Sequence, residues 1–246
     1  MCGRYFIDMV PDDGELEEIV QELNRRGLAR PAGTGDPSAA AGANVTAAIS
    51  GAGDAPQARI APDAARGDAR VPPLKTCGEI FPTDVVPVVA NGREGGYRAG
   101  GGVRPGRPRA FAMRWGYTLS GSRRVINARS ETAAERPMFS DGMRARRLLI
   151  PASGYYEWLR HDKKAQKYAI RPGAGGAIYM AGIYRFEAGT PVFTILTREP
   201  EPSVAFIHDR MPVILPQEAA RDWLNLDCGA QDVLRAAALH VTAAAV

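Results

Sequence analysis

Short apolar segments, each bounded by turn-forming residues, are the feature that most limits how this chain can fold. They are typical of strands joined by hairpins, which pair antiparallel. Few segments have helical periodicity. The sequence therefore predicts an α+β fold, with a mostly antiparallel, barrel-like β-sheet core and peripheral helices. The segments in the second half of the chain are RRLLIPASGYYEW, KYAIRP, AIYMAGIYRF and VFTILTR.

The first half contains further candidate elements. MCGRYFIDMV alternates around Tyr5 and Ile7 and predicts a strand, while DDGELEEIVQELNRRG has helical spacing behind an acidic start. The apolar run from Val85 to Val89 predicts another strand. It is followed by GREGGYRAGGGVRPGRPR and by the strand AFAMRWGY, and we expect a hairpin of the two strands with the glycine- and arginine-rich segment as its long loop. Near the end, PQEAARDWLNL predicts a helix with proline at its first turn.

Residues 28–70 differ from the rest in composition. They are rich in Ala, Gly, Pro and Asp and nearly devoid of aromatic residues. Such a segment buries too little apolar surface to offset the entropy of ordering. A helix is the alternative, because alanine favours one, but the repeated Gly and Pro oppose it. We expect one domain, residues 1–246, with a flexible insertion at 28–70 and no internal repeat.

Charge and cysteine content narrow the class of protein. The net charge of +4 and the pI of about 9.1 suit a nucleic-acid partner, but they are also common in ordinary cytosolic enzymes. Three widely spaced cysteines do not form a disulfide framework and favour a reducing compartment. No apolar run reaches the ~20 residues of a membrane span. We expect a cytoplasmic protein without a membrane anchor.

Cys2 is the first candidate for chemistry. If Met1 is removed, Cys2 becomes an N-terminal 1,2-aminothiol, whose amine adds to an aldehyde and whose thiol can then close a thiazolidine ring. An α-amino group with a pKa of ~7.7 is about one-sixth unprotonated at pH 7, whereas a lysine at ~10.4 is almost fully charged. The alternative is that Cys2 is an ordinary buried cysteine, and the position of the residue in the sequence, taken alone, favours this alternative.

Few other residues can move protons. Of the three histidines, His208 stands out, because in FIHDRMPVIL it lies at the edge of an apolar strand. His161, in RHDKKAQK, is expected to be a solvated turn residue. Glu157 ends SGYYEW, where aromatic neighbours can raise the pKa of a carboxyl group. No Cys and His pairs have zinc-ligand spacing, so we expect no metal and no other cofactor.

The segment NARSET has polar residues at alternate positions. If it is extended, Asn127, Arg129 and Glu131 share one face and could line a site. An exposed edge strand with an Arg129 to Glu131 salt bridge is an equally good interpretation of the pattern.

Together, five ordered motifs resemble the SOS-response-associated peptidase (SRAP) family. They are MCGRY at Met1, WGY at Trp115, NARSET at Asn127, SGYYEW at Ser153 and HDRMPVIL at His208. The similarity runs from Met1 to about Trp223, omitting residues 28–70. The combination is far more specific than any single motif.

The resemblance implies a protein that crosslinks covalently to abasic sites in single-stranded DNA through an N-terminal cysteine freed by self-processing or methionine removal. It also implies that the crosslink shields the lesion from strand breakage. We expect a monomer that associates with the nucleoid when it is bound to DNA. The family's catalytic residues fall on Cys2, Asn127, Glu157 and His208. Its DNA-binding positions fall on Arg4, Arg129, Trp115, Trp158 and Pro82, although the sequence around Pro82 lacks the asparagine usual in the family.

Two rival functions remain open at this point. Glutamine-amidotransferase-like N-terminal hydrolases also begin with Met-Cys-Gly, but they usually carry an aliphatic residue where this chain has Arg4. A noncatalytic single-strand binding module would explain the arginines and tryptophans but gives no reason for an aminothiol.

Overall fold

The computed structural model describes most of the chain outside its second quarter. Residues 18, 19, 21, 22 and 25 are helical, but the rest of the expected first helix and the whole expected insertion at 28–70 lie outside the described residues. The described residues are 2–8, 18–19, 21–22, 25, 72–97, 103–161, 164–237 and 240–246.

Five strands form a closed ring. β12 pairs with both β4 and β11, which closes the order β12, β4, β3, β8, β11. Only the β12 to β4 pairing in this ring is parallel. The predicted barrel-like, mostly antiparallel sheet is therefore confirmed. The ring strands are β3 (Val85–Tyr97), β4 (Val103–Trp115), β8 (Arg147–Ala152), β11 (Ile178–Glu187) and β12 (Thr190–Arg198).

Short strands extend the ring at two sides. β7 (Asn127–Arg129) runs parallel to β12, and β13 (Met211–Pro212) and β14 (Ile214–Leu215) pair with β12 and β11. A separate hairpin, β5 (Tyr117–Ser120) with β6 (Arg123–Val125), lies between β4 and β7 along the chain.

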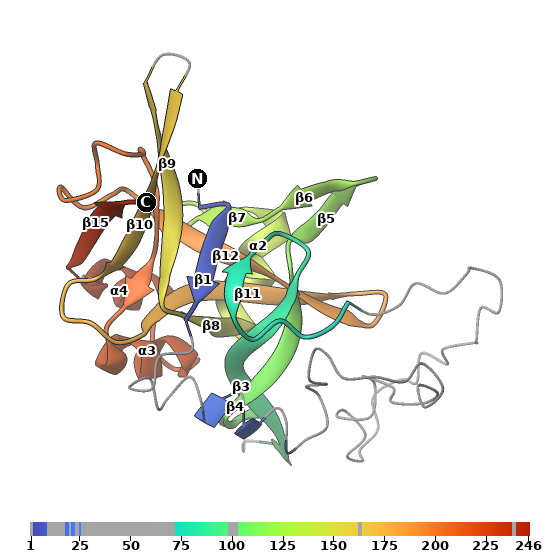
Figure 1. The fold of residues 1–246 in the computed structure, drawn as a ribbon. Coiled ribbons are helices and arrows are strands. Elements are labelled where there is room, and N and C mark those ends of the chain that lie inside the picture. The colour runs from blue at the N-terminus through green and yellow to red at the C-terminus, as the bar shows by residue number, and fades with distance from the viewer. Residues whose placement is uncertain are drawn as a thin grey trace.

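A second, open sheet carries the N-terminal strand (Figure 1). Its order is β15, β10, β9, β1, β2, and every pairing is antiparallel. The predicted N-terminal strand is confirmed as β1. The members are β1 (Arg4–Ile7), β2 (Gly78–Ile80), β9 (Gly154–His161), β10 (Lys164–Pro172) and β15 (Val241–Ala245).

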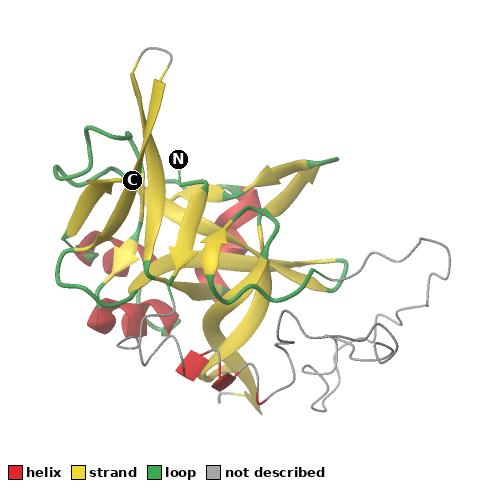
Figure 2. Ribbon diagram, viewed as in Figure 1, coloured by secondary structure: helices red, strands yellow, loops and turns green. Residues whose placement is uncertain are grey.

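Helices lie outside the strands (Figure 2). They are α2 (Pro137–Ala145), α3 (Gln217–Leu224) and α4 (Ala230–Ala236), and α3 confirms the helix predicted from PQEAARDWLNL. The α+β class is thus confirmed. No helix in the described part of the chain is long and apolar enough to cross a membrane.

Alternation along the ring strands separates two cores. On β8, Leu148 and Ile150 join the core that contains Cys2, Tyr5 and Trp115, whereas Leu149 faces the other core, with Trp223 of α3. Successive strand residues point to opposite faces, so one strand serves both cores. The first core joins the ring to the open sheet and places the N-terminus against the barrel.

The expected single strand RRLLIPASGYYEW is in fact two strands in different sheets. β8 belongs to the ring and β9 to the open sheet, and they meet at Ser153 and Gly154. A Cβ atom at Gly154 would lie 2.4 Å from the Ile170 carbonyl oxygen and 2.5 Å from the Phe6 ring. Only glycine fits there. At this point the chain passes from the ring to the open sheet, so Glu157 lies on β9, the strand that pairs with β1.

The expected hairpin is confirmed, but most of its glycine- and arginine-rich tip is strand rather than loop. β3 continues to Tyr97 and β4 begins at Val103, so most of the segment is a long hairpin. The pairing shifts register between Asn91 and Arg93 and again before Tyr97. Backbone hydrogen bonds pair the two strands, and glycines accommodate bulges in such a hairpin.

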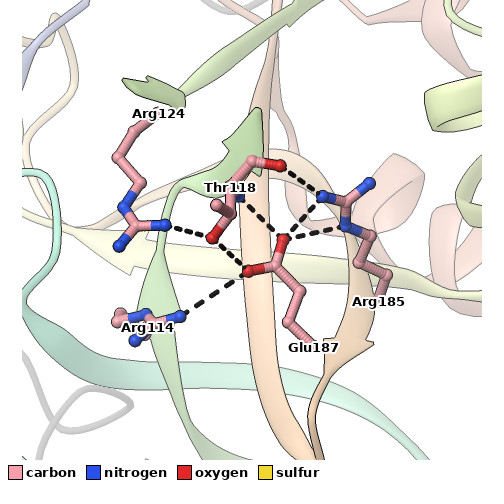
Figure 3. A network of polar contacts seen from close by, with 5 residues as sticks. All are labelled: Arg114, Thr118, Arg124, Arg185 and Glu187. Atoms are coloured by element: carbon pink, nitrogen blue, oxygen red, sulfur yellow. Dashed lines mark hydrogen bonds and ion pairs between the residues drawn. The ribbon is translucent and has the colours of Figure 1, made fainter. Parts of the chain in front are cut away.

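A polar network anchors the β5–β6 hairpin to the barrel (Figure 3). The Glu187 carboxylate accepts hydrogen bonds from the Thr118 N–H at 2.7 Å and hydroxyl at 2.5 Å, and from Arg185 at 2.6 Å. Arg114 lies 3.7 Å from the same carboxylate, and Arg124 donates to the Thr118 hydroxyl. The network fixes the segment that leads directly into Asn127.

Candidate functional site

Cys2 and Asn127 meet where the two sheets face each other. The Asn127 Nδ2 at the start of β7 donates a 2.8 Å hydrogen bond to the Cys2 carbonyl oxygen, just before β1. The Cys2 Sγ lies 3.6 Å from the Arg4 carbonyl, and the side chain is fully buried. The backbone of residue 2 is therefore fixed by a residue from the barrel.

Glu157 lies on the neighbouring strand with its side chain toward the core. β9 alternates, so Tyr155 and Glu157 are buried while Tyr156 and Trp158 on the other face are half-buried. Burial raises the pKa of the Glu157 carboxyl, and the charge of His208 acts in the opposite direction. The direction of this shift agrees with the rise predicted from the sequence, and a carboxyl group with a raised pKa is suited to proton transfer.

The Cys2 thiol is not a ready thiolate. Burial, and next the negative charge of Glu157, raise its pKa well above the ordinary range. At neutral pH the sulfur keeps its proton. The environment thus favours an amine over the thiol as the first nucleophile, with a neighbouring base needed before the sulfur reacts.

His208 lies in the loop before β13 and is half-buried. Its Nδ1 is 3.0 Å from the Arg210 backbone nitrogen and 2.7 Å from Asp209 Oδ1. The first contact needs a lone pair on Nδ1 and the second a proton, so only one forms at a time. Either contact holds the Nδ1 edge of the ring against its own loop.

Three further polar atoms surround Cys2 and were not all expected from sequence. The hydroxyls of Tyr5 and Tyr155 and the Oδ1 of Asn127 are buried with no hydrogen-bond partner among the described residues. Burial, then the charges of Cys2 and Glu157, raise the pKa of the Tyr155 hydroxyl, which stays protonated. Buried polar groups of this kind are rare and are available to a ligand. In the sequence, both tyrosines look like core residues.

On the opposite face of the open sheet, Arg4 lies between two aromatic rings. Its Cζ is 4.6 Å from the Phe81 ring centre and 4.9 Å from that of Trp158, and its guanidinium is 3.5 Å from Glu79. Pro82 follows Phe81 in a turn whose next residue, Thr83, has a φ of 81°. The structure thus brings together Arg4 and Trp158, two residues that the resemblance implied, and Pro82 follows the phenylalanine on the other side of Arg4.

Two expectations for the remaining residues need correction. β7 ends at Arg129, so Glu131 does not continue its face, and Glu131 pairs with Arg210 at 2.9 and 2.8 Å rather than with Arg129. Arg129 itself is exposed.

Trp115 is fully buried, and its indole donates to the Ile126 carbonyl at 2.9 Å. It leaves no ring face for DNA, so we assign it to the core.

Metal ligation finds no support in the described part of the chain, where no three His, Cys, Asp or Glu side chains come together. The three cysteines are free thiols, with Cys77 exposed and Cys228 partly buried. His161, at the end of β9, is exposed.

Comparison with known proteins agrees with this arrangement. The sequence profile of the SOS response associated peptidase (SRAP) family matches residues 1–245. The chain belongs to the SRAP family. The resemblance drawn from five motifs is thereby confirmed, and SRAP membership over the whole chain favours this family over the N-terminal amidohydrolases.

Curated SRAP relatives share about 30 to 40% identity over part of the chain. The abasic site processing protein YoqW of Bacillus subtilis is 39% identical over 108 residues, which are 42% of this chain and 48% of that protein. The abasic site processing protein YedK of Escherichia coli is 36% identical over 118 residues, 46% of this chain and 53% of its own length. The matches thus span about half of each relative.

Solved structures share the fold. A phage-related protein from Bordetella bronchiseptica superposes with a TM-score of 0.61 at 21% identity, covering 100% of this chain and 94% of that one. A protein from Bacteroides thetaiotaomicron gives 0.53 at 20% identity over 68% of this chain and 77% of its own. At these identities the likeness shows the fold alone.

Proposed function

We propose that the protein captures abasic sites in single-stranded DNA covalently, through the amine and thiol of Cys2 after Met1 is removed. The observation that carries the proposal is the position of Cys2, whose carbonyl is held by Asn127 and whose thiol feels the charge of Glu157. Relatives named abasic site processing proteins support the same substrate.

The first step is addition of the Cys2 amine to the C1′ aldehyde of the ring-opened sugar. Loss of water gives a Schiff base, and Glu157, with its raised pKa, supplies and removes the protons. His208 acts beside it at the sugar oxygen, and the same proton transfer in reverse would release the crosslink.

The second step is ring closure. The Cys2 thiol loses its proton to a neighbouring base as the sulfur attacks the imine carbon, and the imine nitrogen gains a proton. The product is a thiazolidine, and the net reaction releases one water. Burial raises the pKa of this thiol. Ring closure therefore depends on that base more strongly than it would for the thiol of an exposed cysteine.

Noncovalent binding comes from residues around the nucleophile. Arg4 and the exposed Arg129 contact phosphates, and Trp158 and Pro82 lie beside the lesion on the Arg4 side. Such contacts give affinity without sequence preference. Removal of Met1, by self-processing or by an aminopeptidase, is the activation step that the chemistry requires.

The test is a denaturing gel of the mature protein with single-stranded DNA that contains one abasic site. Wild type should give a heat-stable adduct and Cys2→Ala none, although both bind the DNA. Cys2→Ser should give a Schiff base that borohydride traps but no stable ring. An adduct of equal yield from Cys2→Ala would refute the proposal.

A further inference from the structure

An exposed phenylalanine lies beside the candidate site and is not used by the mechanism above. Phe206 is 55% exposed, two residues before His208. The same loop is anchored, because Val204 and Ile207 are buried in the core at 2% and 6% exposure. The position of Phe206 on the surface is therefore set by its buried neighbours.

The Phe206 ring contacts Tyr168 of β10 edge-on. The ring centres are 5.6 Å apart and the planes meet at 87°. Tyr168 pairs in register with Glu157 of β9, so the two side chains share one face of the open sheet. Tyr168 therefore lies between the exposed Phe206 ring, which it contacts, and the buried Glu157, which is its cross-strand neighbour.

The same face continues along the β9–β10 hairpin. Alternation places Leu159 beyond Glu157 on β9, and Lys164 beyond Tyr168 on β10, on this side of the sheet. Leu159 is half-buried and Lys164 is exposed. Figure 1 shows this part of the hairpin projecting beyond the body of the protein, near the N-terminus. An aromatic platform with a cation further along suits a strand with stacked bases and charged phosphates.

We propose that the Phe206 and Tyr168 pair is a stacking platform for the unpaired base next to the abasic nucleotide. The inference rests on the proposed function and extends it from the lesion to its neighbour. Phe206 supplies the open ring face, and Tyr168 holds that ring through the edge contact. Stacking is tolerant of sequence because every base has a π-face, so the platform adds affinity without base preference.

The chain offers a matched control. Phe186 on β11 is 50% exposed and also meets a tyrosine edge-on, with ring centres of Phe186 and Tyr184 6.0 Å apart at 78°. It lies on a ring strand next to the β11–β12 turn rather than on the face of Glu157. Phe206→Ala and Phe186→Ala therefore remove the same side chain from similar surroundings.

The experiment measures the affinity of each variant for single-stranded DNA carrying a stable tetrahydrofuran abasic analogue. Phe206→Ala should weaken binding about 5- to 100-fold, Phe206→Leu should lose most of the same affinity, and Phe206→Trp should retain it. Phe186→Ala should match wild type. The salt dependence of Phe206→Ala binding should equal that of wild type, because no phosphate contact is lost.

A second oligonucleotide isolates the stacking contact. Replacing the base on the 5′ or the 3′ side by another tetrahydrofuran unit should abolish the difference between Phe206→Ala and wild type on one of these two DNAs. If Phe206→Ala binds as tightly as Phe186→Ala, or if the difference survives both replacements, the platform is refuted. A change in oligomeric state on Phe206→Ala would also refute it, because the ring would then cover a second copy.

The two proposals fail in different ways. Adduct formation by wild type on a natural abasic site tests the proposed function, and the affinity of Phe206→Ala for the tetrahydrofuran DNA tests the platform. If wild type itself forms no adduct, the proposed function is wrong, whereas equal affinities with normal adduct yield reject the platform alone.

Discussion

The side-chain amide of Asn127 donates a hydrogen bond to the carbonyl oxygen of Cys2 at 2.8 Å, and this bond joins the barrel to the N-terminal strand of the open sheet. The carbonyl belongs to the residue whose amine we propose as the nucleophile. Holding the carbonyl fixes the peptide plane, and with it the Cα atom that carries the amine. The position of the reactive nitrogen thus depends on a residue 125 positions away in sequence.

Asn127→Ala should slow adduct formation about 10- to 100-fold while lowering the free energy of unfolding by only about 1 kcal/mol. Asn91 provides the control, because its Nδ2 donates a comparable bond to the Leu224 carbonyl at 2.6 Å, away from the site. Asn91→Ala should cost similar stability and leave the single-turnover rate unchanged. Equal rates for both variants would show that Asn127 is structural.

Glu157→Gln should slow adduct formation about 100-fold or more and, at neutral pH, stabilise the fold. The reason is that burial raises the pKa of this carboxyl in the folded state, so its ionised form opposes folding. The stability advantage of the variant should appear as the pH rises above ~4.3, the unfolded value, and level off above the folded pKa. Chemical denaturation of both proteins from pH 4 to 8 measures it. A wild type that stays the more stable at every pH would contradict this account.

Glu187→Gln should destabilise the protein at neutral pH by about 1 to 2 kcal/mol, because it weakens the network that holds the β5–β6 hairpin. Although burial opposes it, hydrogen bonds from Thr118 and Arg185 lower the pKa of Glu187 overall. A pKa that is lower in the folded protein stabilises the fold at pH values above ~4.3, the pKa of glutamate in the unfolded chain. That stabilisation is lost as the pH falls through the pKa of Glu187 in the folded protein. The exposed Glu135 is the control, and Glu135→Gln should leave the unfolding midpoint unchanged.

Arg4→Ala and Arg129→Ala should each weaken binding to single-stranded DNA and reduce the slope of log affinity against log salt by about 0.7. Arg144 on α2 is the control, since it is highly exposed and pairs with Asp141. Titrations between 50 and 300 mM salt would measure the slopes. A slope for Arg4→Ala equal to that of Arg144→Ala would assign Arg4 to packing between Phe81 and Trp158.

The sequence indicates the class of fold because hydrophobic alternation and turn residues are local signals. It does not indicate which sheet a strand joins, and so the division at Ser153 and Gly154 is invisible until Phe6 and Ile170 come close. The extension of β3 and β4 through glycine and arginine was missed for a similar reason, since backbone pairing needs no apolar pattern.

The candidate site was predicted as a set of residues but not as an arrangement. Asn127, Glu157 and Cys2 are brought together by strands from two sheets, which no local pattern encodes. Glu131 was placed on the face of Asn127 by alternation, but the strand ends at Arg129. Trp115 was assigned to DNA although the barrel interior buries it completely.

The most direct test of the account compares two forms of the protein that differ only at the N-terminus. One carries a tag ahead of Cys2, and the other carries the tag after Val246 and has lost Met1. Each is incubated with single-stranded DNA containing an abasic site and analysed by denaturing gel and mass spectrometry. A residue ahead of Cys2 turns its amine into an amide, whose lone pair is delocalised into the carbonyl. We predict an adduct on Cys2 for the C-terminally tagged protein alone. An adduct of equal yield from the protein in which Cys2 is internal would contradict the thiazolidine mechanism.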